Sequence, residues 1–251
     1  MCIRDRFYSK VVGVVAVASI GIMALYWLLS FFAFKRPVAE TMAGAASSSY
    51  YNSINIGLPI ATYVIGDATY AVPVLVLQVA ILTPLIITGL NWGGSEKGAT
   101  LKAIVAGLTA PMVVAAIAGF VVSASGWTVP DPIMAPLEIL GGASIPLILM
   151  SFGASLKGDG VLHEERVPTL VASTLKLVGM PAMAWAIGLA FGLSGSDLYA
   201  AVILAALPTA QNVYNYTATY RVGETVARDT VFITTFLSLP AMLVIALLFG
   251  H

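Results

Sequence analysis

Asn52-Ser-Ile-Asn-Ile-Gly-Leu-Pro59 interrupts one long apolar run of this chain, and Leu207-Pro-Thr-Ala-Gln-Asn212 interrupts another. Each interruption lies near the middle of a run that is otherwise long enough to cross a bilayer. A proline inside a helix removes a backbone hydrogen bond and clashes with the preceding turn, so it kinks or ends the helix. Backbone groups that are freed in hydrocarbon find no water, so such breaks persist only inside protein or beside a wet cavity. The two breaks therefore predict a polar site in the interior of a membrane protein.

The composition is typical of an integral membrane protein. Of the 251 residues, 59% are hydrophobic and 10% are charged, whereas soluble domains carry about 25% charged residues. Twelve basic and twelve acidic residues cancel, so no net field attracts nucleic acid. A single cysteine and two histidines are too few for an internal disulfide or a metal cluster. We expect a lipid bilayer around the chain and neither a metal nor a cofactor.

Charged residues divide the chain into eight apolar segments. Each has the roughly 17–25 mainly apolar residues that a membrane-spanning helix needs, and none alternates in polarity as a β-barrel strand would. The first ten residues fit poorly with the rest of the chain, and we set 1–10 aside as a non-native segment without function. The prediction is an all-α polytopic membrane protein with spans at 11–34, 41–66, 68–91, 101–124, 132–156, 167–192, 198–220 and 230–250.

The loop charges predict an orientation. Eight basic residues lie on the side of the odd-numbered loops, whereas the basic residues on the opposite side all belong to 1–10. The positive-inside rule therefore makes the side of the odd-numbered loops cytoplasmic and leaves both termini outside. The expected location is the inner (plasma) membrane. The basic residues in the loops after the first, third, fifth and seventh spans, with the adjoining helix ends, are Lys35, Arg36, Lys97, Lys102, Lys157, Arg166, Arg221 and Arg228.

The two broken spans are five helices apart, so they run in opposite directions through the membrane. Opposite direction is what an inverted-topology repeat requires. We assign 11–91 to the first repeat, with its crossover at 52–59, and 101–250 to the second, with its crossover at 207–212. The fourth and fifth spans then lack partners, which predicts an N-terminally truncated form of a five-plus-five transporter fold with eight of ten helices present. The alternative is a natural eight-helix protein in which the Leu-Pro match is chance.

The residues of both breaks resemble a known family. The pattern Asn52-x-x-x-x-Gly57-x-Pro59 is similar to the fourth-helix motif of the auxin efflux carrier family, which includes bacterial malonate and malate carriers and the plant PIN proteins. LPTAQNVYNYTATY at 207–220 is similar to its ninth helix, and ASIPLILMSFGASLKG at 143–158 to the end of its seventh. The resemblance implies that 11–91 holds helices three to five and 101–250 helices six to ten. It also implies a moving transport domain and a scaffold through which the full-length protein forms a homodimer.

Four amide side chains belong to the breaks: Asn52, Asn55, Gln211 and Asn212. Counting from flanking charges puts them near the middle of the bilayer, where an unpaired polar group costs several kcal/mol. A half-helix that begins after a break offers N–H groups and the positive end of its dipole to a carboxylate, and amides can both donate and accept. This chemistry favours a small organic anion as the bound partner. The alternative is that the amides only satisfy backbone groups or pack helices together.

The remaining predicted site residues are the turn residues Gly57, Pro59 and Pro208 and one buried cation. Because proline is favoured at the first position of a helix, we expect each proline to open the second half of its broken helix. Lys176 lies ten residues, or about 15 Å of helix, past Arg166, deep in its span. Ionisable residues at this depth are costly and functional by default. We expect Lys176 either to offset substrate charge or to hold and release crossover carbonyls, with snorkelling to the surface as the alternative.

These observations favour a secondary active transporter of a small organic anion such as a carboxylate, working by alternating access. No P-loop is present, so we expect an ion gradient, H⁺ or Na⁺, to supply the energy. We expect no enzyme activity and no catalytic residue, since neither HExxH nor Gly-x-Ser-x-Gly occurs. A receptor or sensor that binds without transport, and an intramembrane enzyme, are the alternatives. Arg228 and Asp229, at the start of the last span, are expected to be interfacial anchors.

Overall fold

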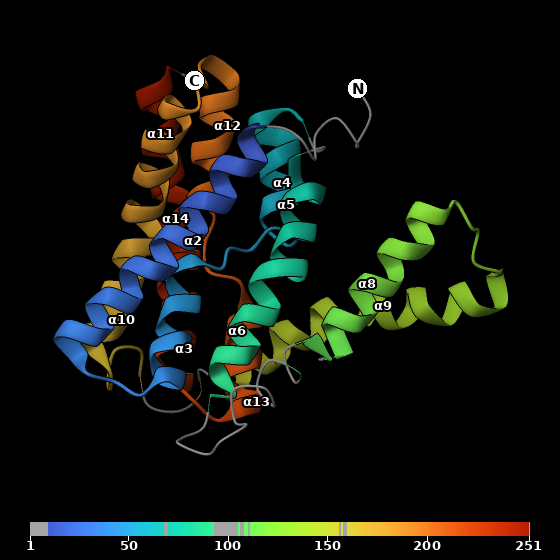
Figure 1. Ribbon diagram of the computed structural model, residues 1–251, viewed down its shortest axis with the longest axis horizontal. Coiled ribbons are helices and arrows are strands. Elements are labelled where there is room, and N and C mark those ends of the chain that lie inside the picture. The colour runs from blue at the N-terminus through green and yellow to red at the C-terminus, as the bar shows by residue number, and fades with distance from the viewer. Residues whose placement is uncertain are drawn as a thin grey trace.

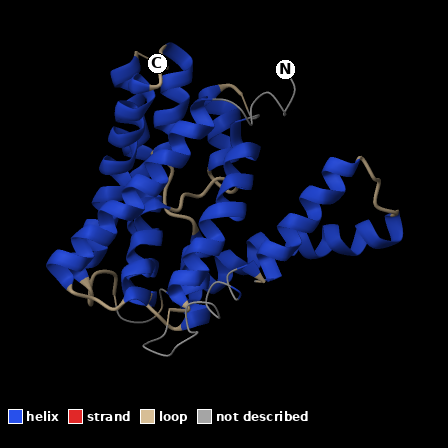
Figure 2. Ribbon diagram, in the orientation of Figure 1, coloured by secondary structure: helices blue, strands red, loops and turns tan. Residues whose placement is uncertain are grey.

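The computed structural model describes residues 10–67, 70–92, 105, 108–109, 111–155, 157 and 160–250. Every regular element among them is a helix (Figures 1 and 2). In the first part these are α2 (Lys10–Leu29), α3 (Val38–Ser49), α4 (Gly57–Ile60), α5 (Ala71–Leu77) and α6 (Thr83–Leu90). In the second part they are α8 (Pro111–Ser125), α9 (Asp131–Ser155), α10 (Arg166–Thr174), α11 (Met180–Ala190), α12 (Gly195–Ala205), α13 (Gln211–Tyr220) and α14 (Glu224–Phe249). Five-residue π-helical turns extend or join several of them: η1 (Ser30–Phe34), η2 (Ala61–Ile65), η4 (Gln78–Leu82) and η5 (Leu175–Gly179).

Within the described residues, four continuous helices are long and apolar enough to cross a membrane: Lys10–Phe34, Pro73–Leu90, Arg166–Ala190 and Glu224–Phe249. They match four of the eight predicted spans, so the prediction of an all-α membrane protein is confirmed. The predicted spans 41–66 and 198–220 are each divided into two shorter helices. The prediction of span 101–124 lies partly outside the described residues.

Both breaks are present, but the prolines do not open the second half-helices as predicted. α4 begins at Gly57, two residues before Pro59. α13 begins at Gln211, three residues after Pro208, and its N-cap residue Ala210 is extended. The reason in the second break is that 208–210 pairs with the first break, and such pairing needs an extended backbone (Figure 2).

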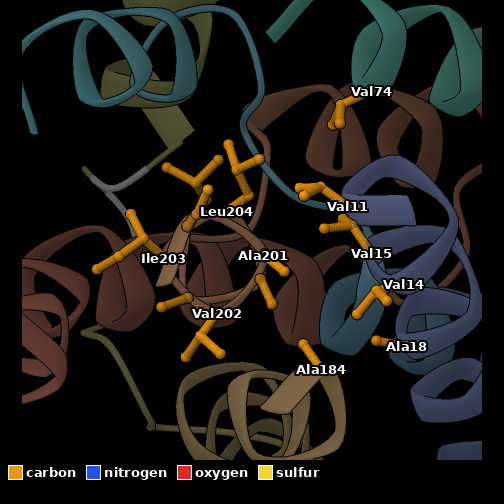
Figure 3. Close-up of a cluster of buried hydrophobic side chains, with 14 of the residues drawn as sticks. Val11, Val14, Val15, Ala18, Val74, Ala184, Ala201, Val202, Ile203 and Leu204 are labelled. Carbon is orange, nitrogen blue, oxygen red and sulfur yellow. The ribbon is translucent and has the colours of Figure 1, made fainter. Parts of the chain in front are cut away.

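α12 is the centre of the larger hydrophobic core. All residues from Leu198 to Ala205 are buried, as expected for a helix that is apolar on every side. It packs against α2, α11, α14 and η2. Figure 3 shows Ala201, Val202, Ile203 and Leu204 of α12 surrounded by side chains from α2, α5 and α11. The second break therefore follows directly from a helix at the centre of this core.

α3 packs closely on α2 because its residues are small. Every residue of α3 from Thr41 to Ser49 is buried, and a Cβ atom on Gly44 would overlap the buried ring of Tyr26 in α2. Small residues let helix backbones approach each other in membranes. The first break thus begins from a helix that is held firmly against the bundle.

The pair α8 and α9 projects to one side of the bundle formed by the other helices (Figure 1). α9 carries Pro136 and Pro146 within its length. It contacts the bundle through α13, which follows the second break. This contact brings α9 close to the breaks.

Asp229 is fully buried, so the prediction of an interfacial anchor is wrong for this residue. Its carboxylate accepts hydrogen bonds from the backbone N–H of Leu162 and from Nε of Arg228, both at 2.8 Å. A buried charge of this kind persists only when it is paired and hydrogen-bonded. Arg36 adds a second tie to the same connection between α9 and α10 by pairing with Glu165.

We expect Asp229→Ala to loosen the connection at 160–165. The substitution leaves the Leu162 N–H and the Arg228 guanidinium without their acceptor, and a hydrogen bond to a charged group contributes about 1.5–3 kcal/mol. Limited proteolysis of the purified protein should cleave this segment faster, with a lower melting temperature. Glu224→Ala, at the exposed start of the same helix, is the matched control. Equal cleavage rates in the two variants would contradict the assignment.

Candidate functional site

The two breaks lie side by side and run antiparallel. Tyr51 and Thr209 form an antiparallel bridge. On either side of it, the N–H of Asn52 donates to the Pro208 carbonyl at 2.8 Å, and the N–H of Ala210 donates to the Tyr50 carbonyl at 3.1 Å. Backbone groups that a break leaves without a helical partner must be satisfied when they are buried. Here the two breaks satisfy one another.

Thr209 anchors the second break to the rest of the bundle. Its hydroxyl donates to the carbonyl of Ser47 in α3 at 2.6 Å. Its N–H donates to the hydroxyl of Thr234 in α14 at 3.1 Å. Thr209 is fully buried, so these bonds are shielded from water and hold the break in one position.

Gln78 supports the first break in a similar way, although it is not among the site residues predicted from the sequence. This side chain comes from the π-helical turn η4 and is 1% exposed. Its Nε2 donates to the Tyr51 carbonyl at 2.7 Å, and its Oε1 accepts a hydrogen bond from the Ser53 hydroxyl. A lone amide in the apolar run 71–90 is a signal that could have identified it, because polar groups inside membranes are expensive.

The four predicted amides are brought together. Asn52 is buried and its Oδ1 accepts a hydrogen bond from the N–H of Asn55 at 3.1 Å, while Asn55 Nδ2 lies 3.5 Å from Oε1 of Gln211. All four, including Asn212, line one cavity of about 280 Å³. Gln78 and, from α9, Ser144 also line it.

The turn residues play different parts in this geometry. Gly57 is buried, and its N–H donates to the Asn52 carbonyl at 2.8 Å. A Cβ atom at this position would lie 3.0 Å from Cδ1 of Leu207 and 3.1 Å from the Asn52 carbonyl oxygen, so the site is built for glycine. Pro208 contributes its carbonyl to the pairing of the breaks. Pro59 is exposed and does not line the cavity.

Lys176 lies near the breaks but not in the cavity wall. Its side chain is fully buried. Nζ donates to the carbonyl of Ala205, the last residue of α12, and to Sδ of Met180, both at 3.0 Å. Nζ also lies 5.5 Å from the centre of the Tyr51 ring. Snorkelling to the surface, the alternative to a functional role for this residue, therefore does not occur.

The cavity can make hydrogen bonds in both directions, since each amide both donates and accepts. Among its described lining residues none is Asp, Glu, Lys, Arg or His. The N-terminal turn of α13 begins at this cavity with Gln211, and the positive end of a helix dipole favours an anion. The described residues also contain no group of three or more His, Cys, Asp or Glu side chains that could hold a metal ion.

Comparison with known proteins relates the chain to membrane transport proteins. A protein described as "Putative malonate transporter" from Rhizobium meliloti (strain 1021) is 28% identical over 235 residues, which cover 88% of this chain and 71% of that protein. The family model described as "Membrane transport protein" matches residues 8–246. Since this match spans nearly the whole sequence, the chain belongs to the membrane transport protein family, the auxin efflux carrier-like family that its break residues resemble.

Proposed function

We propose that this membrane transport protein is a secondary transporter that carries a small organic anion, such as a carboxylate, by alternating access around the two paired breaks. The observation that carries the proposal is the cavity of about 280 Å³ at the breaks, lined by five amides: the four of the breaks and Gln78. Its volume suits a small molecule, and its amides and the start of α13 suit a carboxylate. The similarity to a protein whose description names malonate makes malonate the first substrate to test.

The supports of the two breaks favour the inverted repeat that this mechanism uses. Gln78, in the helical span that follows the first break, donates a hydrogen bond to that break. Thr234 of α14, the helical span that follows the second break, accepts a hydrogen bond from the second break. Equivalent supports in equivalent places are what two inverted copies of one unit would provide. In this proposal the breaks are crossover helices, the basic loops face the cytoplasm and a gradient of H⁺ or Na⁺ drives transport.

Reconstitution into lipid vesicles tests the proposal. Vesicles that contain the protein should accumulate radiolabelled malonate faster than protein-free vesicles, and unlabelled malonate should compete. Accumulation should respond to an imposed H⁺ or Na⁺ gradient. Saturable binding without net movement into the vesicle lumen would instead indicate a sensor, and would contradict the transporter.

Gln211→Ala should weaken the apparent affinity for the carboxylate by about 10-fold or more. A hydrogen bond to a charged group contributes about 1.5–3 kcal/mol, and 1.4 kcal/mol corresponds to a factor of ten. The concentration dependence of malonate uptake in vesicles measures this change. Asn91→Ala is the matched control, because among the described residues the Asn91 amide side chain bonds to the Ile87 carbonyl of its own helix, at 2.9 Å. Equal affinities in the two variants would exclude Gln211 as a ligand.

A further inference from the structure

Lys176 has no carboxylate partner among the described residues. It is fully buried, and the salt bridges of the described residues, at Arg36 and Arg228, do not include it. Its polar partners are instead the Ala205 carbonyl and the Met180 thioether. A buried amino group is expensive unless its hydrogen bonds are satisfied. The contacts of Nζ are therefore the reason this residue can be buried here.

The Ala205 carbonyl is one of the groups that the end of α12 leaves without a helical partner. The last carbonyls of a helix have no N–H ahead of them, and a nearby lysine can take that place. Ala206 N donates to Val202 and Ile203, and Leu207 N donates to Leu204 at 3.4 Å. Lys176 thus closes the end of α12 at the point where the second break begins.

Lys176 reaches the first break as well. Nζ lies over the ring of Tyr51 at 5.5 Å from its centre, a distance at which an amino group and an aromatic face attract each other. Tyr51 is the residue that pairs with Thr209 in the antiparallel bridge. One side chain therefore contacts the residue that ends α12 and the residue that aligns the two breaks.

We propose that Lys176 is a positioning residue: its amino group fixes the end of α12 against Tyr51 and so sets the register of the two breaks, without touching the substrate. The proposal rests on the transporter assignment only in the experiment that measures uptake. Four of the five amides of the cavity, all except Gln78, lie on the segments that Lys176 holds, so a shift of either segment displaces them. Lys176 acts on the cavity through Tyr51 and Ala205.

A substrate-free measurement separates this role from direct binding. In a Cys2→Ser background, Asn212→Cys places a single thiol in the cavity wall, and its rate of labelling by a maleimide reports the shape of the wall. Lys176→Met keeps the length of the side chain and removes its donors. We expect it to change the labelling rate by at least about fivefold, which corresponds to about 1 kcal/mol and is within the net value of one hydrogen bond.

Chemical rescue supplies the second arm. Lys176→Ala removes the side chain beyond Cβ, that is, three carbons and the amino group. n-Propylamine consists of the same heavy atoms, so when added it should restore the labelling rate toward that of the parent protein. The same amine should restore malonate uptake in Lys176→Ala and leave Gln211→Ala unchanged. Size-exclusion chromatography of each variant checks that the chain is folded.

Three outcomes would overturn the proposal. One is an unchanged labelling rate in Lys176→Met. Another is lost uptake with an unchanged labelling rate, which would make Lys176 a direct ligand. The third is a labelling rate in Lys176→Ala that n-propylamine does not move. If the parent protein carries no carboxylate at all, the transporter assignment fails, but the labelling rates still decide whether Lys176 positions the breaks.

Discussion

Gly57→Val is expected to reduce carboxylate uptake by about 100-fold while the chain still inserts into the membrane. A Cβ atom at Gly57 would lie 3.0 Å from Cδ1 of Leu207 and 3.1 Å from the carbonyl oxygen of Asn52. The leucine side chain can move by a few tenths of an ångström, but the carbonyl belongs to the backbone of the paired breaks. Overpacking costs about 1–3 kcal/mol, and about 2.8 kcal/mol corresponds to a factor of 100. Valine at this position therefore displaces the Asn52 backbone, which forms part of the cavity wall.

The effect should be graded and specific to the breaks. Gly57→Ala adds only the Cβ atom and should cause a smaller loss than valine. Gly13→Val in α2 is the matched control, because a Cβ atom at Gly13 meets nothing within 4 Å. Uptake rates in vesicles, normalised to the amount of inserted protein, measure all three. Wild-type uptake by Gly57→Val, or an equal loss in Gly13→Val, would show that the close contact at the breaks does not matter.

The positions of the breaks could be predicted from the sequence because their signals are local. A proline and several amides within an apolar run need no partner to be recognised, and the structure brings Asn52, Asn55, Gln211 and Asn212 to one cavity. The starts of the second half-helices could not be predicted. Pro208 is kept in extended backbone by hydrogen bonds to the other break, more than 150 residues away, and this pairing overrides the preference of proline for the first helical turn.

Which groups the supports of the breaks contact could not be predicted, for a related reason. Gln78 and Lys176 both lie in π-helical turns, η4 and η5, which rotate the side chains after them relative to a regular helix. Depth along a span can be counted from flanking charges, but the direction in which a side chain points cannot. That is why the sequence leaves open whether Lys176 meets the substrate or the crossover carbonyls, and the structure places its amino group on the Ala205 carbonyl. The Thr209 anchors to α3 and α14 likewise depend on contacts between distant segments.

Gln78→Met should reduce carboxylate uptake by about 30-fold or more, although it keeps the length and much of the volume of the side chain. The substitution leaves the Ser53 hydroxyl without its acceptor and removes one of the two donors to the Tyr51 carbonyl, which keeps the Ser53 N–H at 3.0 Å. A buried polar group that loses its partner costs about 1–3 kcal/mol, and a lost hydrogen bond about 0.5–1.5 kcal/mol. Together they give about 1.5–4.5 kcal/mol, and about 2 kcal/mol corresponds to a factor of 30. Tyr51 also carries the bridge to Thr209, so the loss should extend to both breaks.

A double-mutant cycle separates this explanation from a general loss of stability. Ser53→Ala removes one of the two partners of Gln78, so its effect on uptake should be smaller in Gln78→Met than in the parent protein. Residues that share one hydrogen bond deviate from additivity, whereas independent ones do not. Thr62→Val is the control, since the exposed Thr62 hydroxyl bonds to the Leu58 carbonyl one turn earlier, at 2.8 Å, and lies outside both breaks. Additive effects of Gln78→Met and Ser53→Ala would mean that Gln78 does not act through Ser53. Uptake by Gln78→Met as in the parent protein would mean that the first break keeps its shape without Gln78, and that the bridge to Thr209 and the contact with Lys176 suffice to hold Tyr51 in place.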